Sequence, residues 1–411
     1  LASFLLFNQL LFYRIYRQRV EDSDLPPLSD VKNPIKDLQT NFNLLKNKGY
    51  HAIYNVNILK HIQDNPQVNK TINRAITSFR LINANMLTHD IVGRFFHALI
   101  PHDAAKVLAT FYTHPNAAAI LSGLAIKHDQ EIVYDPACGS GTLLVSCYHA
   151  KQNFYEKRLG KFRPQKMHQQ FLEQEIYGSD VMPFAAHLST INLALQKIEE
   201  KTNDVKIYCM DSLLQSYRFK DPNFTEGKGM KVESLQKLGT QTLDHFFDDS
   251  PLKNIPEIDM EAGGAVSTSG AGVGFFVKPF DVIIMNPPFT ANTRFTDKMR
   301  EKIKNNKHLT ELVGGSVHLW GFFLALSYLG VKLGGTVAAV LPISVARGAD
   351  TQGTRDLLMK KFSTRFIIKP VKDDAFSESA DFKDILYIGE RRKVTDDDKT
   401  GIVLFKSSVR E

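Results

Sequence analysis

The chain has 411 residues, of which 43% are hydrophobic and 23% charged, and it carries a formal net charge of +7 with a pI near 9.0. These values are ordinary for a soluble globular protein with two domains, or one large domain with an appendage, and the basic balance points mildly towards a polyanionic partner. The three cysteines have neither disulfide nor metal-ligand spacing, which predicts a reduced, cytoplasmic protein without a metal site.

The first stretch, LASFLLFNQLLFYRIYRQR (1–19), is apolar but is interrupted by two amides and two arginines. A signal peptide carries its positive charges before the apolar run, and here they follow it. No uninterrupted apolar stretch reaches the roughly 20 residues that a membrane span needs. We therefore expect no membrane contact. Because the chain starts at Leu1, we also expect a fragment or a trimmed chain.

Residues 1–105 are predicted to be helical, because apolar positions recur every three or four residues with little strand signal. Two further amphipathic stretches lie at 73–81 and 91–99. The acids and prolines of DSDLPPLSD (22–30) predict a loop between helices. The pattern indicates a helical N-terminal domain.

From about residue 130, short β-rich runs alternate with helical stretches such as 143–159 and 183–198. The β-rich runs are 131–135, 175–180, 205–211, 280–286, 334–342 and 365–371. This alternation predicts a doubly wound, Rossmann-like α/β domain over 106–411 with a mostly parallel sheet. The last two runs, 382–392 and 401–408, leave no room for a crossover helix between them and predict an antiparallel edge.

Residues 214–278 interrupt this alternation and contain the glycine-rich stretch EAGGAVSTSGAGVGFF (261–276). Its glycines at 270, 272 and 274 are spaced like part of a nucleotide fingerprint. No strand precedes them, and their neighbours are Ser and Ala. We interpret the segment as an insertion that forms a flexible loop.

A second glycine-containing stretch, VYDPACGSGTLLVS (133–146), is better placed, because a predicted strand ends at Asp135 and a helix opens near Thr142. Gly139 and Gly141 allow a ligand to approach the backbone, and a helix N-terminus favours negative charge.

The ligand of this loop is not a pyrophosphate. A phosphate-binding loop needs a lysine where leucines follow here, and a dinucleotide fingerprint needs a third glycine where Leu144 stands. A zwitterionic amino-acid nucleoside fits, with its carboxylate near the helix start and its ammonium near Asp135. S-adenosylmethionine is such a molecule.

Two further acids, Asp180 and Asp211, end predicted strands. The first suits a ribose diol, as in dinucleotide folds, and the second suits the amino group of an adenine ring. For each acid alone, a helix cap or a solvated loop is an equally good explanation. Three acids at consecutive strand ends favour a ligand site.

The stretch FDVIIMNPPFT (280–290) ends a predicted buried strand, because prolines cannot donate to a sheet. The side-chain carbonyl of Asn286 and the peptide carbonyl of Pro287 are two fixed acceptors, which suit one NH2 group. Phe289 offers a flat face for stacking a base. An exocyclic amine held this way keeps its lone pair turned towards a methyl donor, so catalysis is mostly positioning and electrostatics.

Together these motifs resemble the amino-group DNA methyltransferases, and more narrowly the N6-adenine methylase of type I restriction–modification systems and related type II fusion enzymes. DPACGSG (135–141) matches the family's cofactor loop and NPPF (286–289) its catalytic tetrapeptide. FYTHP (111–115) resembles its upstream motif, and GSDVMPFAAHLSTINLAL (178–195) the stretch after the second strand. The resemblance covers roughly residues 75–410. The cofactor loop precedes the tetrapeptide, as in the class of these methylases that has its target-recognition region towards the C-terminus.

The resemblance implies a site-specific, S-adenosylmethionine-dependent enzyme that methylates N6 of an adenine flipped out of double-stranded DNA. The implied partners are DNA, a specificity (target-recognition) subunit and a restriction subunit. Asp180 would hold the ribose, Asp211 the cofactor adenine, and the upstream motif the methionine end. The implied catalytic residues are Asn286, Pro287, Pro288 and Phe289. The implied cofactor-binding residues are Phe111, Tyr112, Thr113, Asp135, Ala137, Gly139, Gly141, Thr142, Asp180, Val181, Asp211 and Ser212.

Basic residues follow the tetrapeptide and are candidates for phosphate contacts, although a solvated helix face explains any one of them equally well. They are Arg294, Lys298, Arg300, Lys302, Lys304 and Lys307. His318 and Trp320 are interpreted as packing at the start of a helix.

Alternative functions share parts of this pattern. Enzymes that methylate glutamine in release factors and guanine N2 in RNA carry an Asn-Pro-Pro-aromatic tetrapeptide. N4-cytosine methylases more often have serine at the position of Asn286. A non-catalytic scaffold that binds DNA or a partner is a fourth alternative, and a fused nuclease stays open. No separate target-recognition domain follows Glu411, so either it has been cut away or another subunit supplies specificity.

Overall fold

The structure is a computed structural model, and its description covers most of the helical region and the α/β region. The described residues are 2–20, 23–54, 57–81, 83, 112–159, 166–202, 204–213, 216–217, 230–233, 276–277, 279–371, 375–378 and 383–406.

The N-terminal region is helical, as predicted, over its described residues. Its elements are α1 (Ala2–Arg19), η1 (Leu28–Asp30), α2 (Pro34–Asn47), α3 (His51–Tyr54), η2 (Ile58–His61) and α4 (Pro66–Leu81). Asn33 caps α2 by accepting from the N–H of Lys36, and Pro34 supplies the first helical residue with a preset φ. The stretch 91–99 and the proposed boundary near 105 lie outside the described residues, so both stay predictions.

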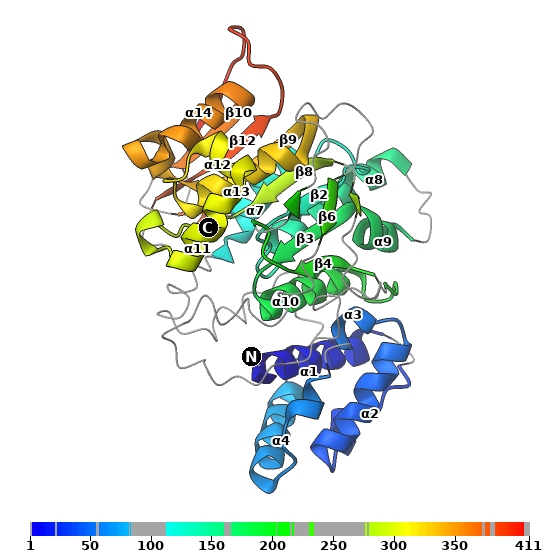
Figure 1. The fold of residues 1–411 in the computed structure, drawn as a ribbon. Coiled ribbons are helices and arrows are strands. Elements are labelled where there is room, and N and C mark those ends of the chain that lie inside the picture. The colour runs from blue at the N-terminus through cyan, green and yellow to red at the C-terminus, as the bar shows by residue number, and fades with distance from the viewer. Residues whose placement is uncertain are drawn as a thin grey trace.

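These helices share a core with the α/β region. Buried side chains of α1 and α4 form one cluster that continues into Leu188 and Ile191 of α10 (Pro183–Ala194). The Tyr50 hydroxyl donates to the carbonyl of Ile198, and a ring nitrogen of His187 contacts the carbonyl of Ile53 at 2.9 Å. Figure 1 shows the helices packed beneath α10, at the far end from α14. Among the described helices, none is long and apolar enough to cross a membrane.

An eight-stranded sheet forms the centre of the α/β region, in the order β13-β10-β12-β9-β8-β2-β3-β4. Its strands are β2 (Val133–Asp135), β3 (Ile176–Asp180), β4 (Lys206–Cys209), β8 (Phe280–Met285), β9 (Val331–Pro342), β10 (Ser363–Pro370), β12 (Asp384–Glu390) and β13 (Gly401–Phe405). The strands β4, β3, β2, β8 and β9 all pair in parallel, so their carboxyl ends lie along one edge.

Helices cover both faces of this sheet (Figure 1). Along β8, Val282 and Ile284 join one core cluster, while Ile283 and Met285 join the other, as the period of two in a strand requires. The first cluster includes α7 (Pro115–Ala125), α8 (Thr142–Leu159), α9 (Met167–Gln170) and α10. The second includes α11 (Asp297–Asn305), α12 (Lys307–Val313), α13 (Leu319–Gly330) and α14 (Gln352–Lys361). The predicted doubly wound fold is confirmed.

The far end of the sheet contains the predicted antiparallel element, but its pairing differs from the prediction. β12 runs antiparallel to both β9 and β10. The sequence predicted that the last two strands, β12 and β13, form the antiparallel edge together. In the structure β13 instead runs parallel to β10, on its outer side. β12 and β13 have opposite directions, so the chain needs no helix between them. Residues 391–400 suffice to pass over the end of β10.

Two smaller sheets accompany the main one. β1 (Tyr112–Thr113) pairs antiparallel with β11 (Ser377–Glu378), and β5 (216–217), β6 (230–233) and β7 (276–277) form a three-stranded sheet. The latter lies within the predicted insertion, so part of that segment forms strands. Its glycines at 270, 272 and 274 are outside the described residues.

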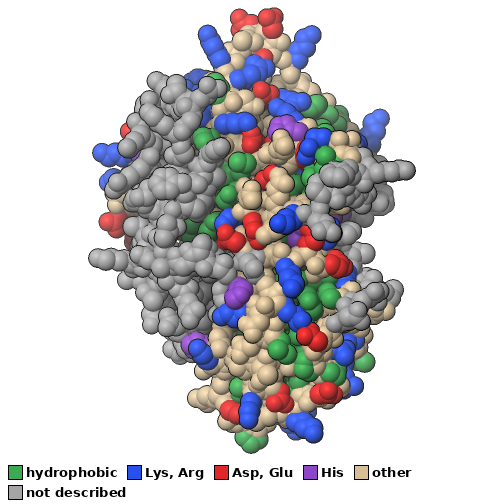
Figure 2. Space-filling model, turned by 90° about the vertical axis from the view of Figure 1, so that its right-hand side faces the viewer, with side chains coloured by type: hydrophobic (Ala, Val, Ile, Leu, Met, Phe, Trp, Pro, Cys, Tyr) green, Lys and Arg blue, Asp and Glu red, His purple; other side chains and the backbone are tan. Residues whose placement is uncertain are grey.

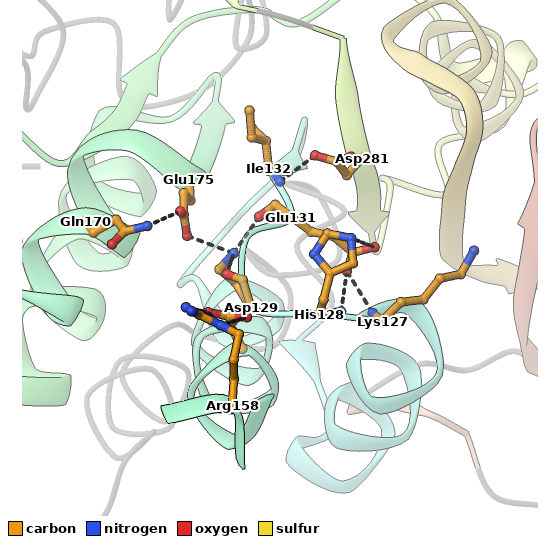
Figure 3. Close-up of polar contacts among 10 residues, drawn as sticks. Lys127, His128, Asp129, Glu131, Ile132, Arg158, Gln170, Glu175 and Asp281 are labelled. Carbon is orange, nitrogen blue, oxygen red and sulfur yellow. Dashed lines mark hydrogen bonds and ion pairs between the residues drawn. The ribbon is translucent and has the colours of Figure 1, made fainter. Parts of the chain in front are cut away.

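The amino end of β2 is closed by ionic contacts among buried groups (Figure 3). The fully buried ammonium of Lys151 donates to the backbone carbonyls of Asp129 and Glu131 and pairs with Glu175 at 3.0 Å. Arg158 pairs with the Asp129 carboxylate at 2.6 Å. Each charge therefore has an opposite charge or a backbone dipole beside it, which is what burial of ions demands.

Candidate functional site

The glycine loop follows β2 and is fastened to the end of β3. The N–H of Gly139 donates to the Asp180 carboxylate at 2.9 Å, and the N–H of Cys138 donates to the Ser179 carbonyl at 3.0 Å. Gly139 has φ +52°, and a Cβ there would meet no atom within 4 Å. The backbone at Gly139 thus takes a left-handed conformation beside open space, where a ligand can approach it.

Gly141 has a different reason to be glycine. Its φ is +85°, and a Cβ would lie 2.5 Å from the Ser189 Oγ of α10. The second glycine is therefore required by close packing of loop on helix. At the first turn of α8, Thr142 is buried, and its hydroxyl lies 3.1 Å from that of Ser140.

The two acids at the ends of β2 and β3 are held by backbone groups. Asp135 is 1% exposed and accepts from the N–H of Ala137 at 2.9 Å, while partly buried Asp180 accepts from Met182 as well as from Gly139. Within the described part of the chain, no ion pair joins either carboxylate to a cation. Burial raises the pKa of Asp135, and it raises the pKa of Asp180 to about 6 against the opposing N–H donors.

The two candidate residues that follow β4, Asp211 and Ser212, differ in burial and in hydrogen-bond partner. Asp211 is partly exposed and accepts from the N–H of Leu213 at 3.0 Å. Ser212 is buried, and its hydroxyl donates to the carbonyl of Pro136 at 2.6 Å. The structure therefore gives Ser212 a function in anchoring the glycine loop. Val181 lies partly buried just after β3.

The tetrapeptide begins where β8 ends, as predicted. The Asn286 side-chain nitrogen donates to the Thr113 hydroxyl at 3.0 Å and to the Ser377 hydroxyl at 3.2 Å. The carboxamide is planar, so its oxygen points away from these two hydroxyls. Pro287 is buried. Phe289 is partly buried and packs against both core clusters of the sheet.

The tetrapeptide and the glycine loop leave neighbouring parallel strands. β2 and β8 pair with Val133 opposite Val282 and Tyr134 opposite Ile283. Continued by one residue, this register sets Asp135 opposite Ile284. The two motifs therefore start within about two residues of each other on strands roughly 4.8 Å apart.

The upstream motif joins the same region. Tyr112 and Thr113 are buried in β1, and His114 caps α7 by accepting from the N–H of Asn116 at 3.2 Å. The N–H of His114 donates to the Phe376 carbonyl at 2.9 Å. The Thr113 hydroxyl thus accepts a hydrogen bond from Asn286, which lies 173 positions further along the chain. Phe111 lies outside the described residues.

Sequence reasoning missed the residues that support Asn286 from the other side. Ser377 and Asp384 are fully buried, and Asp384 accepts from the N–H groups of Phe376 and Ser377 at 2.7 and 3.0 Å. Ser377 lies outside every predicted strand, and Asp384 lies in the predicted run 382–392 but belongs to no motif. The one available signal was an aspartate at the start of an otherwise apolar run, DILYIG.

The predicted packing role of His318 and Trp320 at the start of α13 agrees with the structure. Trp320 is 1% exposed. The His318 Nδ1 accepts from the N–H of Asn292 at 3.2 Å, and the N–H of Leu319 donates to the Thr290 carbonyl. These contacts hold the segment that follows the tetrapeptide.

The predicted phosphate contacts lie on η8 (Asn292–Arg294), α11 and the start of α12. Arg294, Arg300, Lys304 and Lys307 are exposed, and Lys302 is partly buried. Arg300 also donates to the Asn292 carbonyl at 3.0 Å. On the face shown in Figure 2, by contrast, Lys and Arg are dispersed among Asp and Glu.

Two family models match overlapping parts of the chain. Residues 87–226 match the family described as N-6 DNA Methylase, and residues 174–376 match the Eco57I restriction-modification methylase family. The chain is 31% identical over 111 residues to the adenine-specific methyltransferase BrxX of Escherichia coli O9:H4 (strain HS). That alignment spans 25% of this chain and 9% of BrxX.

Solved structures share the fold at low sequence identity. The methyltransferase subunit of a type I restriction-modification system from Streptococcus thermophilus superposes with a TM-score of 0.52 at 15% identity, covering 99% of this chain and 82% of that one. A nuclease-deletion mutant of the Type ISP enzyme LlaGI, solved with a DNA substrate mimic, gives a TM-score of 0.54 at 10% identity. The similarity covers 98% of this chain and 35% of LlaGI.

Proposed function

We propose that this chain transfers a methyl group from S-adenosylmethionine to N6 of an adenine flipped out of double-stranded DNA. Its matches to the N-6 DNA Methylase and Eco57I restriction-modification methylase families support this. The observation that carries the proposal is the Asn286 side chain. Its nitrogen donates to the Thr113 and Ser377 hydroxyls at the end of β8, and we assign its side-chain oxygen to the amine of the substrate.

The residues at the strand ends fit S-adenosylmethionine. Gly139 leaves open space beside its backbone, which accommodates the amino-acid end of the cofactor near the start of α8. Asp180 keeps acceptor capacity for the ribose hydroxyls beyond its two backbone bonds, since each carboxylate oxygen has two lone pairs. Asp211 suits the adenine amino group. Among the described residues, no group of acids, histidines and cysteines could hold a metal ion.

When bound, the cofactor supplies a methyl group made electrophilic by its sulfonium. The chain's own residues hold the base. The oxygens of Asn286 and Pro287 accept the two N6 hydrogens, which keeps the lone pair of N6 directed at the methyl group. Phe289 stacks on the ring. The amine gains positive charge as it reacts, and both carbonyl dipoles stabilise that charge in place.

The protein extrudes the base at a cost of a few kcal/mol, which stacking and phosphate contacts offset. The exposed cations Arg294, Lys304 and Lys307 follow the tetrapeptide and support this assignment. We further propose that the protein works in the cytoplasm with a specificity subunit and a restriction subunit. The restriction-modification proteins that share its fold support this part.

The test replaces the proposed acceptor and asks where methyl groups appear. Modified adenines are mapped by long-read sequencing in cells that carry the wild-type gene, the Asn286→Ala gene or no gene. We expect adenine methylation at one sequence with the wild-type gene and none with the variant. The purified Asn286→Ala protein should bind S-adenosylmethionine within about twofold of wild type, because the acceptor contacts the base and not the cofactor.

The matched control is Asn73→Ala, which removes an exposed amide on α4 and should leave methylation unchanged. Retained methylation in the Asn286 variant contradicts the assigned catalytic role. Transfer to cytosine, RNA or a release factor instead of adenine would refute the proposed substrate, so radiolabelled transfer to all four is measured in parallel.

A further inference from the structure

Three buried hydroxyl groups form a continuous chain of hydrogen bonds that ends on the glycine loop. The Tyr134 hydroxyl of β2 lies 2.6 Å from the Ser179 hydroxyl of β3, which lies 2.7 Å from the Ser212 hydroxyl after β4. Ser212 donates to the Pro136 carbonyl at 2.6 Å. None of the three hydroxyl-bearing residues is more than 3% exposed. The chain therefore links three neighbouring strands of the sheet to the backbone of the loop.

The direction of these bonds follows from the group at the end of the chain. A carbonyl oxygen only accepts, so Ser212 gives its single hydroxyl hydrogen to Pro136. In its bond with Ser179, Ser212 is therefore the acceptor, and Ser179 is in turn the acceptor from Tyr134. All three hydroxyls donate towards the glycine loop. Bonds aligned in this way polarise and strengthen one another.

The peptide unit between Pro136 and Ala137 is held on both sides. Its carbonyl accepts from Ser212, and its N–H donates to the Asp135 carboxylate at 2.9 Å. A proline ring fixes φ but leaves ψ, which decides where this carbonyl and this N–H point. Because a peptide unit is planar, the two groups turn together. The Ser212 hydroxyl therefore also fixes the direction of the N–H that meets the Asp135 carboxylate.

The rest of the chain is well placed to hold Ser212. The backbone carbonyl of Ser179 accepts from the N–H of Cys138 at 3.0 Å, so this residue contacts the glycine loop through its backbone as well. The Tyr134 ring stacks on Phe280 of β8 with ring centroids 4.5 Å apart, which fixes the first hydroxyl of the chain. Pro136 is itself buried, so its carbonyl would be left without this donor if the hydroxyl were removed.

We propose that Ser179 and Ser212 are positioning residues of the cofactor site, which hold the peptide unit after Pro136 so that the Asp135 carboxylate keeps one orientation. Tyr134 anchors the chain at its far end. The inference rests on the proposed function for the identity of the cofactor, whose ammonium group Asp135 is expected to bind. It assigns Ser212 an effect on the cofactor that is transmitted through the loop and not by direct contact.

The first measurement is the affinity for S-adenosylmethionine, by calorimetric titration of the full chain with any partner subunits it requires. Ser212→Ala should raise the Kd about tenfold, because the peptide unit then spends part of the time turned away from its binding-competent direction. Ser179→Ala, one bond further from the loop, should raise it about threefold. Ser212→Thr keeps the hydroxyl and should stay within about twofold of wild type.

The same variants separate positioning of the cofactor from a general loss of structure. The Kd for duplex DNA, and kcat at saturating S-adenosylmethionine, should both stay within about twofold of wild type in Ser212→Ala and Ser179→Ala. The matched control is Ser363→Ala, which removes a buried hydroxyl on β10 of the same sheet and should change none of these quantities.

The second measurement needs no cofactor. Pro136 and Ala137 form the only Pro-Ala pair in the sequence, so protein labelled with 13C at the proline carbonyl and with 15N in alanine gives a single peptide signal, that of Ala137. We expect this signal to shift in Ser212→Ala and Ser179→Ala and to stay in place in Ser363→Ala. In Ser212→Ala its amide hydrogen should exchange about 5- to 10-fold faster. The other alanine signals report whether each variant is folded.

The two measurements distinguish failure of the inference from failure of the proposed function. If wild-type protein does not bind S-adenosylmethionine, the proposed function fails, and the Ala137 signal still decides whether the hydroxyls hold the peptide unit. An unmoved Ala137 signal in folded Ser212→Ala overturns the inference. A Kd that rises in Ser212→Ala but not in Ser179→Ala also overturns it, because Ser212 would then contact the cofactor directly. An equal rise in Ser212→Ala and Ser212→Thr would reflect packing and has the same consequence.

Discussion

The two ends of the parallel strands use buried charge in opposite ways. At the amino end, Lys151 is paired with Glu175, and Arg158 with Asp129. At the carboxyl end, Asp135 and Asp180 accept from backbone N–H groups, and no described residue forms an ion pair with them. At the first end each buried charge has an opposite charge beside it, whereas the second end holds two carboxyl groups that no described side chain of opposite charge pairs with.

This difference assigns the amino end of the strands to protein stability and the carboxyl end to ligand binding. Burial lowers the pKa of Lys151, and the neighbouring Glu175 opposes this shift. Burial raises the pKa of Asp180 to about 6, and the opposing groups there are only N–H dipoles. A cluster in which each charge is paired stabilises the folded protein without a ligand. Carboxyl groups without a paired cation become ionised at a lower free-energy cost when a ligand supplies hydrogen-bond donors or positive charge.

The largest expected effect comes from breaking the charge pairs at the amino end. Lys151→Met should lower the free energy of unfolding by about 3–5 kcal/mol, because it leaves Glu175 buried without its cation and two carbonyls without a donor. Urea unfolding followed by circular dichroism measures this. The double variant Lys151→Met/Glu175→Gln should recover part of the loss, since the uncompensated charge is gone.

A surface ion pair gives the matched control. Lys360 pairs with Asp356 at 3.0 Å on the exposed face of α14, and Lys360→Met should cost less than about 1 kcal/mol. If the Lys151 and Lys360 variants lose similar stability, the amino-end cluster is not the stabilising unit described above.

The second effect concerns the carboxyl end and is expected in ligand affinity. Asp180→Asn should weaken binding of S-adenosylmethionine by about 10- to 100-fold at pH 8, the value of one or two hydrogen bonds to a charged group. Wild-type affinity should rise as the pH increases through about 6, the pKa of Asp180, and the variant should lose this dependence. Calorimetric titration from pH 5 to pH 8 tests both points.

Stability should change in the reverse sense over the same window. The pKa of Asp180 is raised from 3.8 to about 6 in the folded protein, so between these values the folded state holds a proton that the unfolded state has lost. The free energy of unfolding therefore falls as the pH rises from about 4 to about 6. This slope should be shallower in Asp180→Asn. An equal slope in both proteins would contradict the assignment of this titration to Asp180.

The smallest effect is expected at the exposed cations beyond the tetrapeptide. Lys304→Ala should weaken binding to duplex DNA severalfold and reduce the slope of log K against log salt by about 0.9 if it contacts one phosphate. Lys157→Ala, an exposed lysine at the end of α8, is the control and should change neither quantity. An unchanged salt slope in Lys304→Ala assigns that lysine to a solvated helix face.

Local patterns predicted most of the fold. The strands that contain Asp135, Asp180 and Asn286 lie where their apolar runs predicted them, because burial on both faces produces continuous apolar runs. The partner of β13 was predicted wrongly. Pairing between non-adjacent strands depends on the path of the connection, which a run of apolar residues does not encode.

Within the site, the motifs indicated which residues gather and the structure shows what several of them do. Asp180 was predicted to bind a ribose, and what the structure shows is that its carboxylate fastens the glycine loop through Gly139. Ser212 was assigned to the cofactor, and its hydroxyl binds the Pro136 carbonyl. Such structural bonds are invisible in sequence because they join segments about 40 to 80 residues apart.

The sequence by itself determined the order of the elements, the turn that follows β2 and the rigid tetrapeptide that follows β8, because these depend on side-chain period, glycine and proline, all of which act over a few residues. Only the tertiary structure decided that Thr113 and Ser377 meet at Asn286 and that Lys151 closes the opposite end. Those contacts depend on strand register and chain path, and they are selected by burial and charge compensation in the folded whole.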